Sequence, residues 1–410
     1  MLGMVPRLAW RNVWRNPRRT LLTVAATVFA VFLTVFALAM TTGTHEKMIE
    51  DSARLGSGHI QISGPGYLER RTLEYFLPYD AVLERVLEAQ PRIEGFSARV
   101  VSFGLLSRDD ATFGVGVMGV DPRREPSVTT LASRVKDGRF LDPLGRREVV
   151  LGRRLARNLS ANLGDELLLF SSAYSLETAY DLFEVVGIMR LPDAQLERTL
   201  AVISLADAQE FFVYGNRVSE VAVLAASDRA VPALVAGLRA AVDPERAVVH
   251  TWRETSPEME QIIFLDDVGM YITLAILVVV VGFGILNTIL MAVLERQREF
   301  GVMLALGLRP MSIFRVVYLE SMLLATVGLA IGLALALPLV LFMEGHPIAL
   351  TGGAAEAIEL FGVEPVMTWE LRSGNPLGSS LTILGVALLA ALYPASKAAR
   401  ARPVDALRSV

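Results

Sequence analysis

Four long apolar stretches alternate with charged and polar segments along the chain. Each stretch meets or approaches the roughly 20 apolar residues that a helix needs to cross the hydrocarbon core of a bilayer. We therefore predict an α-helical membrane protein with four transmembrane helices, at residues 20–42, 268–294, 312–343 and 377–395.

The segment that follows the second stretch has the pattern of a short amphipathic helix. Phe300, Met303, Leu304 and Gly307 recur at positions i, i+3, i+4 and i+7, which places them on one helical face. Charged residues border this face, namely Glu295, Arg296, Arg298 and Glu299. Such a helix lies along a membrane surface or in the groove of a partner protein.

The region 43–267, between the first two apolar stretches, mixes strand and helix patterns. Strand-like runs bounded by Gly, Pro and Asp occur at 59–62, 98–105, 113–120, 148–151, 166–170, 183–188 and 221–225. Helical patterns intervene at 81–89, 153–158, 205–213 and 230–241, and we expect Ser227 and Asp228 to cap the last of them. We predict one large α+β domain inserted between the first and second transmembrane helices.

Lysine and arginine are unevenly distributed around the four stretches. Five arginines precede the first stretch, three lie in segment 295–311, and Lys397 and three arginines follow the last stretch. The connection 344–376 has Arg372 as its only basic side chain besides a histidine, against five glutamates. Because basic loops stay in the cytoplasm, we expect both termini and segment 295–311 to be cytoplasmic, and the α+β domain and connection 344–376 to be extracytoplasmic.

The N-terminal region allows two interpretations. In residues 1–19 tryptophans and arginines fall on different helical faces, which predicts a helix at the cytoplasmic membrane interface. Ala37, Leu38 and Ala39 have the small-x-small form of a signal-peptide cleavage site. The apolar region before them is longer than the 7–15-residue core of a typical signal peptide, so we favour a retained helix.

Composition argues against most catalytic chemistry. Hydrophobic residues make up 53% of the chain and the mean hydropathy is +0.46, too apolar for an ordinary soluble protein. There is no cysteine, the four histidines lack metal-site spacing, and a net charge of −4 without a basic surface argues against nucleic acid. No G-x-x-x-x-G-K-[ST] phosphate loop occurs, so we expect no ATPase activity, cofactor or metal in this chain.

One glycine-rich run imitates a nucleotide-binding motif. The sequence from Gly114 to Gly119 matches G-x-G-x-x-G, but that motif binds phosphate only where a strand leads into it and a helix follows. Here Asp121 and Pro122 indicate a turn instead of a helix. We predict a glycine-rich strand.

Three segments together resemble the FtsX/MacB-like ABC-transporter permeases. They are the opening at residues 8–22, the region 283–307 that contains the amphipathic pattern, and the ending at residues 393–408. The resemblance implies a multi-pass protein of the bacterial inner membrane that pairs with a second permease copy or paralogue. It also implies two copies of a separate ATPase subunit, which bind ATP and Mg, and a periplasmic domain that moves as ATP is hydrolysed.

The resemblance favours one branch of the family. The chain length, the size of the domain at 43–267 and the run from Gly116 to Pro122 are similar to the lipoprotein-releasing (LolC/LolE-type) branch. Macrolide-exporter permeases of the family usually carry a fused ATPase domain, which we do not find in this sequence. That branch extracts lipoproteins from the inner membrane and passes them to a periplasmic carrier. An exporter of drugs or peptides with a separate ATPase, and a non-transporting mechanotransmitter that activates a cell-wall hydrolase, remain alternatives.

The resemblance also assigns roles to particular residues. Segment 295–311 would be the coupling helix, in which Phe300, Met303 and Leu304 enter a groove on the ATPase while the neighbouring charges fix the register. Gly301 and Gly307 belong to the same matched region. The alternative is that this segment is a surface loop that only links two transmembrane helices.

Inside the third apolar stretch, Glu320 is an ionisable residue that would face protein or water. We expect it to pair with Arg315 or Arg296, unless it lies at headgroup level. Gly328 and Gly332 form a small-xxx-small face for close helix approach, without indicating the partner helix.

If the chain belongs to the lipoprotein-releasing branch, acyl chains of the substrate would lie between the first two transmembrane helices. On the first helix the expected contacts are Phe29, Phe32, Val35 and Phe36. On the second they are Ile272, Ile276, Val279 and Phe283. The same apolar side chains would suit any lipid-facing helix.

Overall fold

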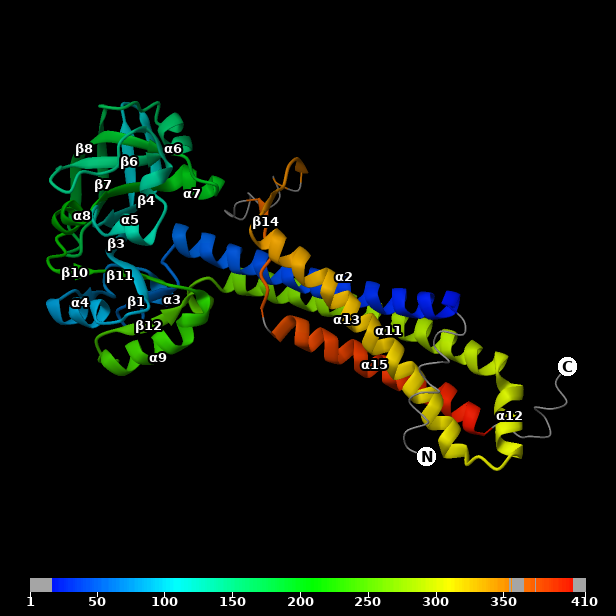
Figure 1. Cartoon of the computed structure of the whole chain (residues 1–410). Coiled ribbons are helices and arrows are strands. Elements are labelled where there is room, and N and C mark those ends of the chain that lie inside the picture. Colours follow the sequence, from blue (N-terminus) through cyan, green and yellow to red (C-terminus); the bar gives the residue numbers. More distant parts are fainter. Residues whose placement is uncertain (1–16, 354, 356–364, 373, 401–410) are drawn as a thin grey trace. The chain divides into compact units, whose positions relative to one another are not determined.

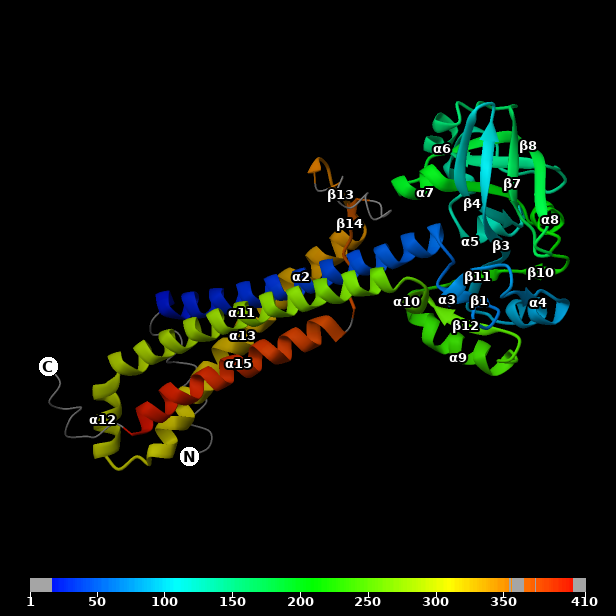
Figure 2. The same ribbon diagram turned by 180° about the vertical axis from the view of Figure 1, so that it is seen from behind.

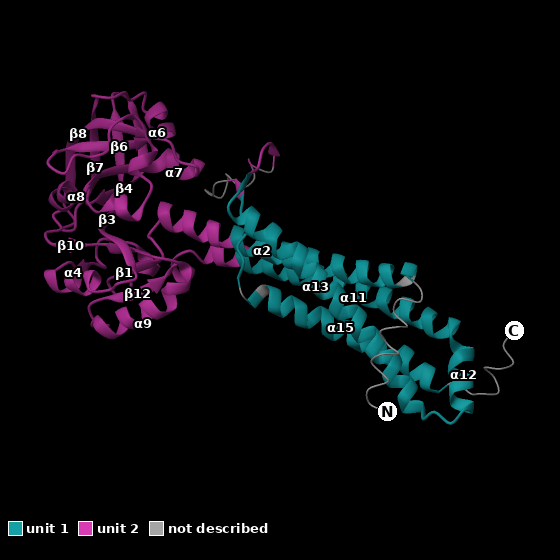
Figure 3. Cartoon of the chain, viewed as in Figure 1, with its two compact units in different colours: residues 1–44, 263–348, 367–410 teal, residues 45–262, 349–366 magenta. Residues whose placement is uncertain are grey.

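The computed structural model describes residues 17–353, 355, 365–372 and 374–400. Most of the expected interfacial helix at residues 1–19 and the tail beyond Arg400 lie outside these ranges. The chain divides into two compact units, coloured separately in Figure 3. The helical unit comprises residues 1–44, 263–348 and 367–410, and the outer unit comprises residues 45–262 and 349–366.

Four long helices lie side by side in the helical unit, as the two opposite views in Figure 1 and Figure 2 show. They are α2 (Pro17–Leu55), α11 (Pro257–Glu295), α13 (Pro310–Glu344) and α15 (Gly374–Ala399). Among the described residues these four are long and apolar enough to cross a membrane. Each contains one of the predicted stretches, because a continuous apolar run satisfies its own backbone hydrogen bonds as a helix.

Two of the helices are much longer than the apolar stretch they contain. Helices α2 and α11 have 39 residues each. At 1.5 Å per residue each is about 58 Å long, nearly twice the hydrocarbon thickness of about 30 Å. The last turns of α2, from His45, and the first turns of α11, up to Ile262, belong to the outer unit.

The glycine face of α13 packs against α2. A Cβ atom added at Gly328 would lie 2.6 Å from the Cβ of Thr27, and one added at Gly332 would lie 2.7 Å from the Cβ of Val31. The absence of side chains therefore allows the two backbones to approach closely. The predicted small-xxx-small face is confirmed, and α2 is its partner.

The outer unit is built on a 10-stranded sheet with the order β12-β1-β11-β3-β4-β9-β6-β8-β5, in which β7 also pairs with β3 and β8. The strands are β1 (Ile60–Ser63), β3 (Ile93–Arg108), β4 (Ala111–Val120), β5 (Val135–Gly138), β6 (Glu148–Gly152), β7 (Glu166–Ser172), β8 (Thr178–Met189), β9 (Leu200–Ser204), β11 (Glu220–Ala225) and β12 (Val248–Thr251). Short strands β2 (Leu77–Pro78) and β10 (Arg217–Val218) pair separately, as do β13 (Ile348–Ala349) and β14 (Val366–Met367).

Short helices pack on this sheet around two apolar cores. One core joins β1, β11 and β12 to α4 (Ala81–Glu88) and α9 (Val231–Ala241). The other joins β4, β6, β7, β8 and β9 to α6 (Arg153–Asn158) and α8 (Leu205–Phe211). The remaining helices of the unit are α3 (Tyr67–Arg70), α5 (Glu125–Val128), α7 (Ala194–Thr199) and α10 (Trp252–Thr255). The unit is therefore an α+β domain.

All seven strand-like runs coincide with strands, and all four helical patterns coincide with helices. Strands β5, β9 and β12 were not predicted, because they are short and lack a distinct alternation. The predicted cap is wrong, since Ser227 makes no side-chain capping bond. Asp228 instead accepts a hydrogen bond of 2.7 Å from Nε1 of Trp252.

The glycine-rich run forms a strand, as predicted. Strand β4 continues through Gly114 and Gly119, and the turn that follows is held by Oδ1 of Asp121, which accepts from the backbone N–H of Arg123 at 2.9 Å. No helix follows the strand in the way the nucleotide motif requires.

We predict that Gly328→Ala lowers the melting temperature of the detergent-solubilised protein. The new methyl group would meet Thr27, and overpacking of this kind costs about 1–3 kcal/mol of unfolding free energy. Gly385→Ala in α15 is the matched control, because a Cβ atom there has no neighbour within 4 Å. Equal melting temperatures for the two variants would contradict the close packing of α2 on α13.

Candidate functional site

The predicted amphipathic segment forms helix α12 (Gln297–Ala305), which joins α11 to α13 at one end of the helical unit (Figure 1). After α12 the chain turns at Gly307, whose φ of 88° is a left-handed conformation that glycine adopts without strain. The backbone N–H of Gly307 donates to the carbonyl of Leu304 at 3.0 Å, and that of Leu308 donates to Met303 at 3.1 Å. Gly307 therefore ends α12 and starts the return into α13.

The apolar stripe of α12 faces the chain's own core, which corrects one part of the prediction. Phe300 is only 1% exposed, and Met303 and Leu304 are partly buried against the same core. That core also contains Val293 of α11 and Val317 of α13. Phe300 cannot enter a groove on another protein while it occupies this position, because the stripe closes the end of the helical unit.

A different set of apolar side chains points outward at this end, and we call it the outward surface. It consists of Val302, Leu306, Leu308 and Met311. Leu306 is 78% exposed, and Arg298 and Arg309 are exposed beside these residues. The spacing of Val302 and Leu306 by four residues was visible in the sequence, but the longer stripe masked it.

A part-buried ion pair connects Arg296, at the start of α12, with Glu320 of α13. Nη1 of Arg296 lies 3.3 Å from Oε2 of Glu320, which is only 8% exposed, and Nε of Arg296 donates to Oε2 of Glu299 at 3.1 Å. The Arg296 guanidinium also lies 5.4 Å from the centroid of the Phe300 ring, within cation–π range. The expected pairing of Glu320 with Arg296 is confirmed, and its carboxylate faces protein.

A small cavity adjoins this ion pair. Its volume is about 20 Å³, enough for one water molecule, and its lining includes the polar side chains of Thr23, Thr288 and Ser321. Helices α2, α11, α12 and α13 all contribute to it. The ion pair thus lies where these helices meet.

Of the eight predicted acyl-chain contacts, five are exposed, two are half-buried and one is buried. The four residues on α11 form an exposed stripe, in which Phe283 is 66% exposed, and Phe29 on α2 is also exposed. Val35 is 0% exposed and packs in a core with Ala336 and Ile383, so its assignment as a substrate contact is wrong. The reason is that the α2 face containing Val31 and Val35 is the one that meets α13.

Phe32 and Phe36 have an intermediate position on α2. Their rings stack with centroids 5.9 Å apart, and Phe36 lies 5.5 Å from the buried ring of Trp369. The backbone N–H of Glu370 donates to the carbonyl of Ala39 at 3.0 Å. The segment around Trp369 therefore covers part of the aromatic face that the sequence suggested was open.

The outer unit has an exposed apolar face of its own. It spans β3, β7 and β8 and consists of Phe103, Leu105, Leu168, Phe170, Tyr180 and Leu182. Cross-strand pairing places Leu105 beside Phe170 and Phe170 beside Tyr180. A hollow of about 420 Å³ adjoins it, lined by Phe103 and floored by Gly114 and Gly116. Contiguous apolar surface of this kind marks sites of contact with protein or lipid.

Within residues 17–353, 355, 365–372 and 374–400, no group of three or more His, Asp or Glu side chains could hold a metal ion.

Comparison with known families gives two adjacent matches. Residues 20–241 match the family model of the MacB-like periplasmic core domain. Residues 271–403 match that of the FtsX-like permease C-terminal domain, which includes α12 and its flanking helices.

Curated relatives match over most of the chain. The lipoprotein-releasing system transmembrane protein LolC of Neisseria meningitidis is 22% identical over 399 residues, 95% of this chain and 94% of the relative. LolE of the lipoprotein-releasing system of Haemophilus influenzae is 27% identical over 338 residues, 80% of each chain. The macrolide export ATP-binding/permease protein MacB of Nitrosomonas europaea is 25% identical over 98% of this chain but only 59% of the relative.

We predict that Arg296→Met lowers the unfolding free energy, because the Glu320 carboxylate loses the guanidinium that lies 3.3 Å from it. The double variant Arg296→Met/Glu320→Met should recover most of this loss, since both charges are removed together. Arg298→Met, at an exposed position, is the control. Thermal unfolding in detergent measures the stability of all three variants. An equal loss of stability in the single and the double variant would contradict a buried pair.

Proposed function

Since this chain belongs to the family of MacB- and FtsX-like ABC transporter permeases, we propose that it is the membrane subunit of a lipoprotein-releasing transporter. The observation that carries the proposal is the match to LolC, which extends over nearly the whole of both chains. The match to LolE supports the same branch.

In this proposal ATP is hydrolysed by a separate subunit. The MacB relative is named both ATP-binding and permease, and this chain covers only 59% of it. The 410 residues contain no phosphate-loop motif. Two copies of an ATPase subunit would bind ATP and Mg in the cytoplasm, and a second permease copy or paralogue would complete the complex.

The proposed orientation places the four helices across the bacterial inner membrane, with both termini and α12 in the cytoplasm. The arginine distribution supports it. The outer unit then lies in the periplasm, where it would meet the lipoprotein and its soluble carrier. The exposed apolar face on β3, β7 and β8 suits a contact with an apolar partner.

Movement would pass from the ATPase to the outer unit through rigid helices. We infer that the outward surface of Leu306 and its neighbours binds the ATPase, while Phe300 and the Arg296–Glu320 pair fasten α12 to α11 and α13. A force on α12 would then act on both α11 and α13. Because α11 continues unbroken from Glu295 back to Pro257, the movement reaches residues of the outer unit.

Extraction of an acylated anchor requires both an apolar holding site and an energy source. Each methylene that leaves the bilayer loses roughly 0.8 kcal/mol, so a multiply acylated protein does not leave unaided. The exposed stripe of α11 and Phe29 of α2 would hold the chains, and ATP hydrolysis would drive the transfer. Export of a macrolide-like molecule is the second candidate, favoured by the match to MacB over 98% of this chain.

We predict that Leu306→Asp abolishes association with the ATPase while the permease still folds and inserts. A charge at this exposed site disturbs only the partner's groove, where an unpaired buried charge costs several kcal/mol. Phe300→Asp should instead destabilise the permease itself, because the charge enters its own core. Co-purification of the ATPase and thermal melting of the permease separate the two effects, and normal association of Leu306→Asp would refute the outward surface.

We also predict that the complex, reconstituted in proteoliposomes with the ATPase and any second permease, releases a lipoprotein to a soluble carrier only during ATP hydrolysis. A photo-crosslinking amino acid in place of Phe29 or Phe283 should capture the acylated protein. The same amino acid in place of Val35 should not, since that position is buried. ATP-dependent efflux of a small amphiphile, without any captured lipoprotein, would favour the exporter instead.

A further inference from the structure

The C-terminal end of α2 is docked into the outer unit. Ala53 is buried in a small core with Val128, Ala222 and Leu224. The carbonyl of Arg54 accepts a hydrogen bond of 2.9 Å from the backbone N–H of Thr130. Carbonyls at the end of a helix have no partner within the helix, so these contacts satisfy them from the domain side.

No flexible linker separates α2 from the sheet. Gly58 has a φ of 75°, and a Cβ atom there would lie 2.4 Å from the carbonyl oxygen of Val223, so only glycine fits. Its N–H donates to the carbonyl of Ala53 at 3.1 Å. Two residues later Ile60 is already paired in the sheet, between Val223 of β11 and Thr251 of β12.

The start of α11 is connected to the same strands. Strand β12 leads into α10 through a capping box formed by Thr251 and Glu254, and α11 begins at Pro257. The backbone N–H of Trp252 donates to the carbonyl of His59 at 3.0 Å. The two long helices therefore enter the outer unit through neighbouring strands that are hydrogen-bonded to each other.

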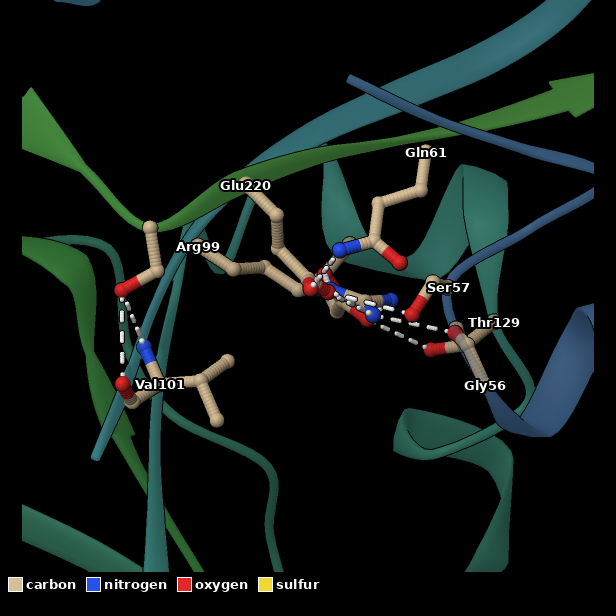
Figure 4. Close-up of polar contacts among 9 residues, drawn as sticks. Gly56, Ser57, Gln61, Arg99, Val101, Thr129 and Glu220 are labelled. Atoms are coloured by element: carbon tan, nitrogen blue, oxygen red, sulfur yellow. Dashed lines mark hydrogen bonds and ion pairs between the residues drawn. The ribbon is translucent and has the colours of Figure 1, made fainter. Parts of the chain in front are cut away.

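A charge cluster lies at this junction, where Arg99, Gln61 and Glu220 meet beside Gly56 and Ser57 (Figure 4). Arg99 on β3 is 1% exposed. Its Nη1 donates to the carbonyl of Gly56, the residue that follows α2, at 2.9 Å. Its Nη2 and Nε contact both carboxylate oxygens of Glu125 at 2.6 and 3.2 Å, and Nη1 lies 3.5 Å from Glu220. Glu220 also accepts from Gln61 at 2.8 Å and from Ser57 at 3.2 Å.

The pKa values of the two carboxylates are shifted in opposite directions. Burial would raise the pKa of Glu125, but the Arg99 guanidinium and the hydrogen bond from Thr129 outweigh this effect, so that pKa is lowered. Burial raises the pKa of Glu220, and Arg99 offsets this effect only in part. Arg99 also lies closer to Glu125, at 2.6 and 3.2 Å, than to Glu220, at 3.5 Å, so Arg99 with Glu125 is the main ion pair.

The geometry that this cluster imposes explains it better than any stability that it adds. A buried ion pair can often be replaced by apolar side chains without loss of stability, because desolvation offsets the attraction of the charges. A guanidinium, however, is a planar fork that can hold several acceptors at fixed angles. Here it fixes the end of α2 to β3, β11 and α5 at once.

We propose that Arg99, Glu125 and Glu220, together with the turn from Gly56 to Gly58, form the rigid joint through which α2 moves the outer unit. The inference rests on the proposed function, in which ATP-driven movement reaches the periplasm. It adds that this joint, rather than the sheet in general, transmits the movement of α2. Loosening it should uncouple ATP hydrolysis from work outside the membrane.

The test uses the full complex in proteoliposomes with two kinds of variant. Arg99→Met/Glu125→Leu removes the main ion pair with both charges, and Arg146→Met/Glu210→Leu removes an exposed pair in the same unit as a control. An insertion of three glycines between Leu55 and Gly56 loosens the joint by a second route. The same insertion after Leu176, in the exposed β7–β8 turn, is its control.

Three quantities are measured. The first two are ATP hydrolysis and lipoprotein release. The third uses a Leu144→Cys variant with a fluorophore on the new cysteine, and measures how far quencher lipids in the membrane reduce its fluorescence. The chain has no other cysteine, and Leu144 is exposed on the outer unit, so quenching reports movement of that unit relative to the membrane. Both joint variants should hydrolyse ATP at the wild-type rate but lose ATP-dependent release and the ATP-dependent change in quenching. Both controls should retain them.

The outcomes separate the two proposals. If the insertion variant keeps wild-type release and quenching changes, the joint is refuted, whether or not the double variant folds. If the wild-type complex shows ATP-dependent quenching changes but releases no lipoprotein, the release proposal fails. The joint is then judged on the quenching signal alone, and it stands only if both joint variants lose that signal.

Discussion

A bilayer offers a backbone no hydrogen-bond partner, so a chain that crosses it must satisfy its amide groups internally. Four helices in the described part of the chain are long and apolar enough to meet this requirement, and two of them do not stop where the apolar stretch ends. The length of α2 and α11 is what connects the two compact units, because each helix contributes residues to both. A proposed mechanism that works by movement depends on this continuity, since a flexible linker would absorb the movement.

Buried ion pairs occur at both regions where these long helices change direction or end. Arg296 and Glu320 fasten α12 to α13, and Arg99 with Glu125 and Glu220 fastens the end of α2 to the sheet. In each case arginine is the cation, and it contacts more than one acceptor. Ion pairs of this kind add little net stability but penalise alternative arrangements, because a displaced partner would leave a charge buried and unpaired.

Amphipathic patterns showed which faces of the helices are apolar but not what covers them. The stripe containing Phe300 was identified correctly as a stripe, yet it packs inside the chain. The same holds for Val35, whose helical face meets the glycine face of α13. Burial against the protein's own helices and burial against lipid or a partner require the same side chains, so periodicity alone cannot distinguish them.

Local patterns in the sequence were sufficient for the parts of the fold that depend on neighbouring residues. The four apolar helices and the strand through Gly114 follow from periodicity and turn residues. The cost of a buried charge indicated that Glu320 needs a partner, but only the structure selected Arg296 over Arg315. Membership in the permease family likewise follows from continuous segments, of which the region 283–307 lies wholly inside a family match.

Only the tertiary structure decided which apolar faces remain open and which distant residues meet. Arg99, Glu125 and Glu220 are separated by up to 121 positions, and no local pattern links them to the end of α2 at Gly56. Their contacts depend on the order and register of β1, β11 and β3, which are set by pairing between distant strands. Such pairing depends on the packing of the whole sheet, so it cannot be read from any one segment of the chain.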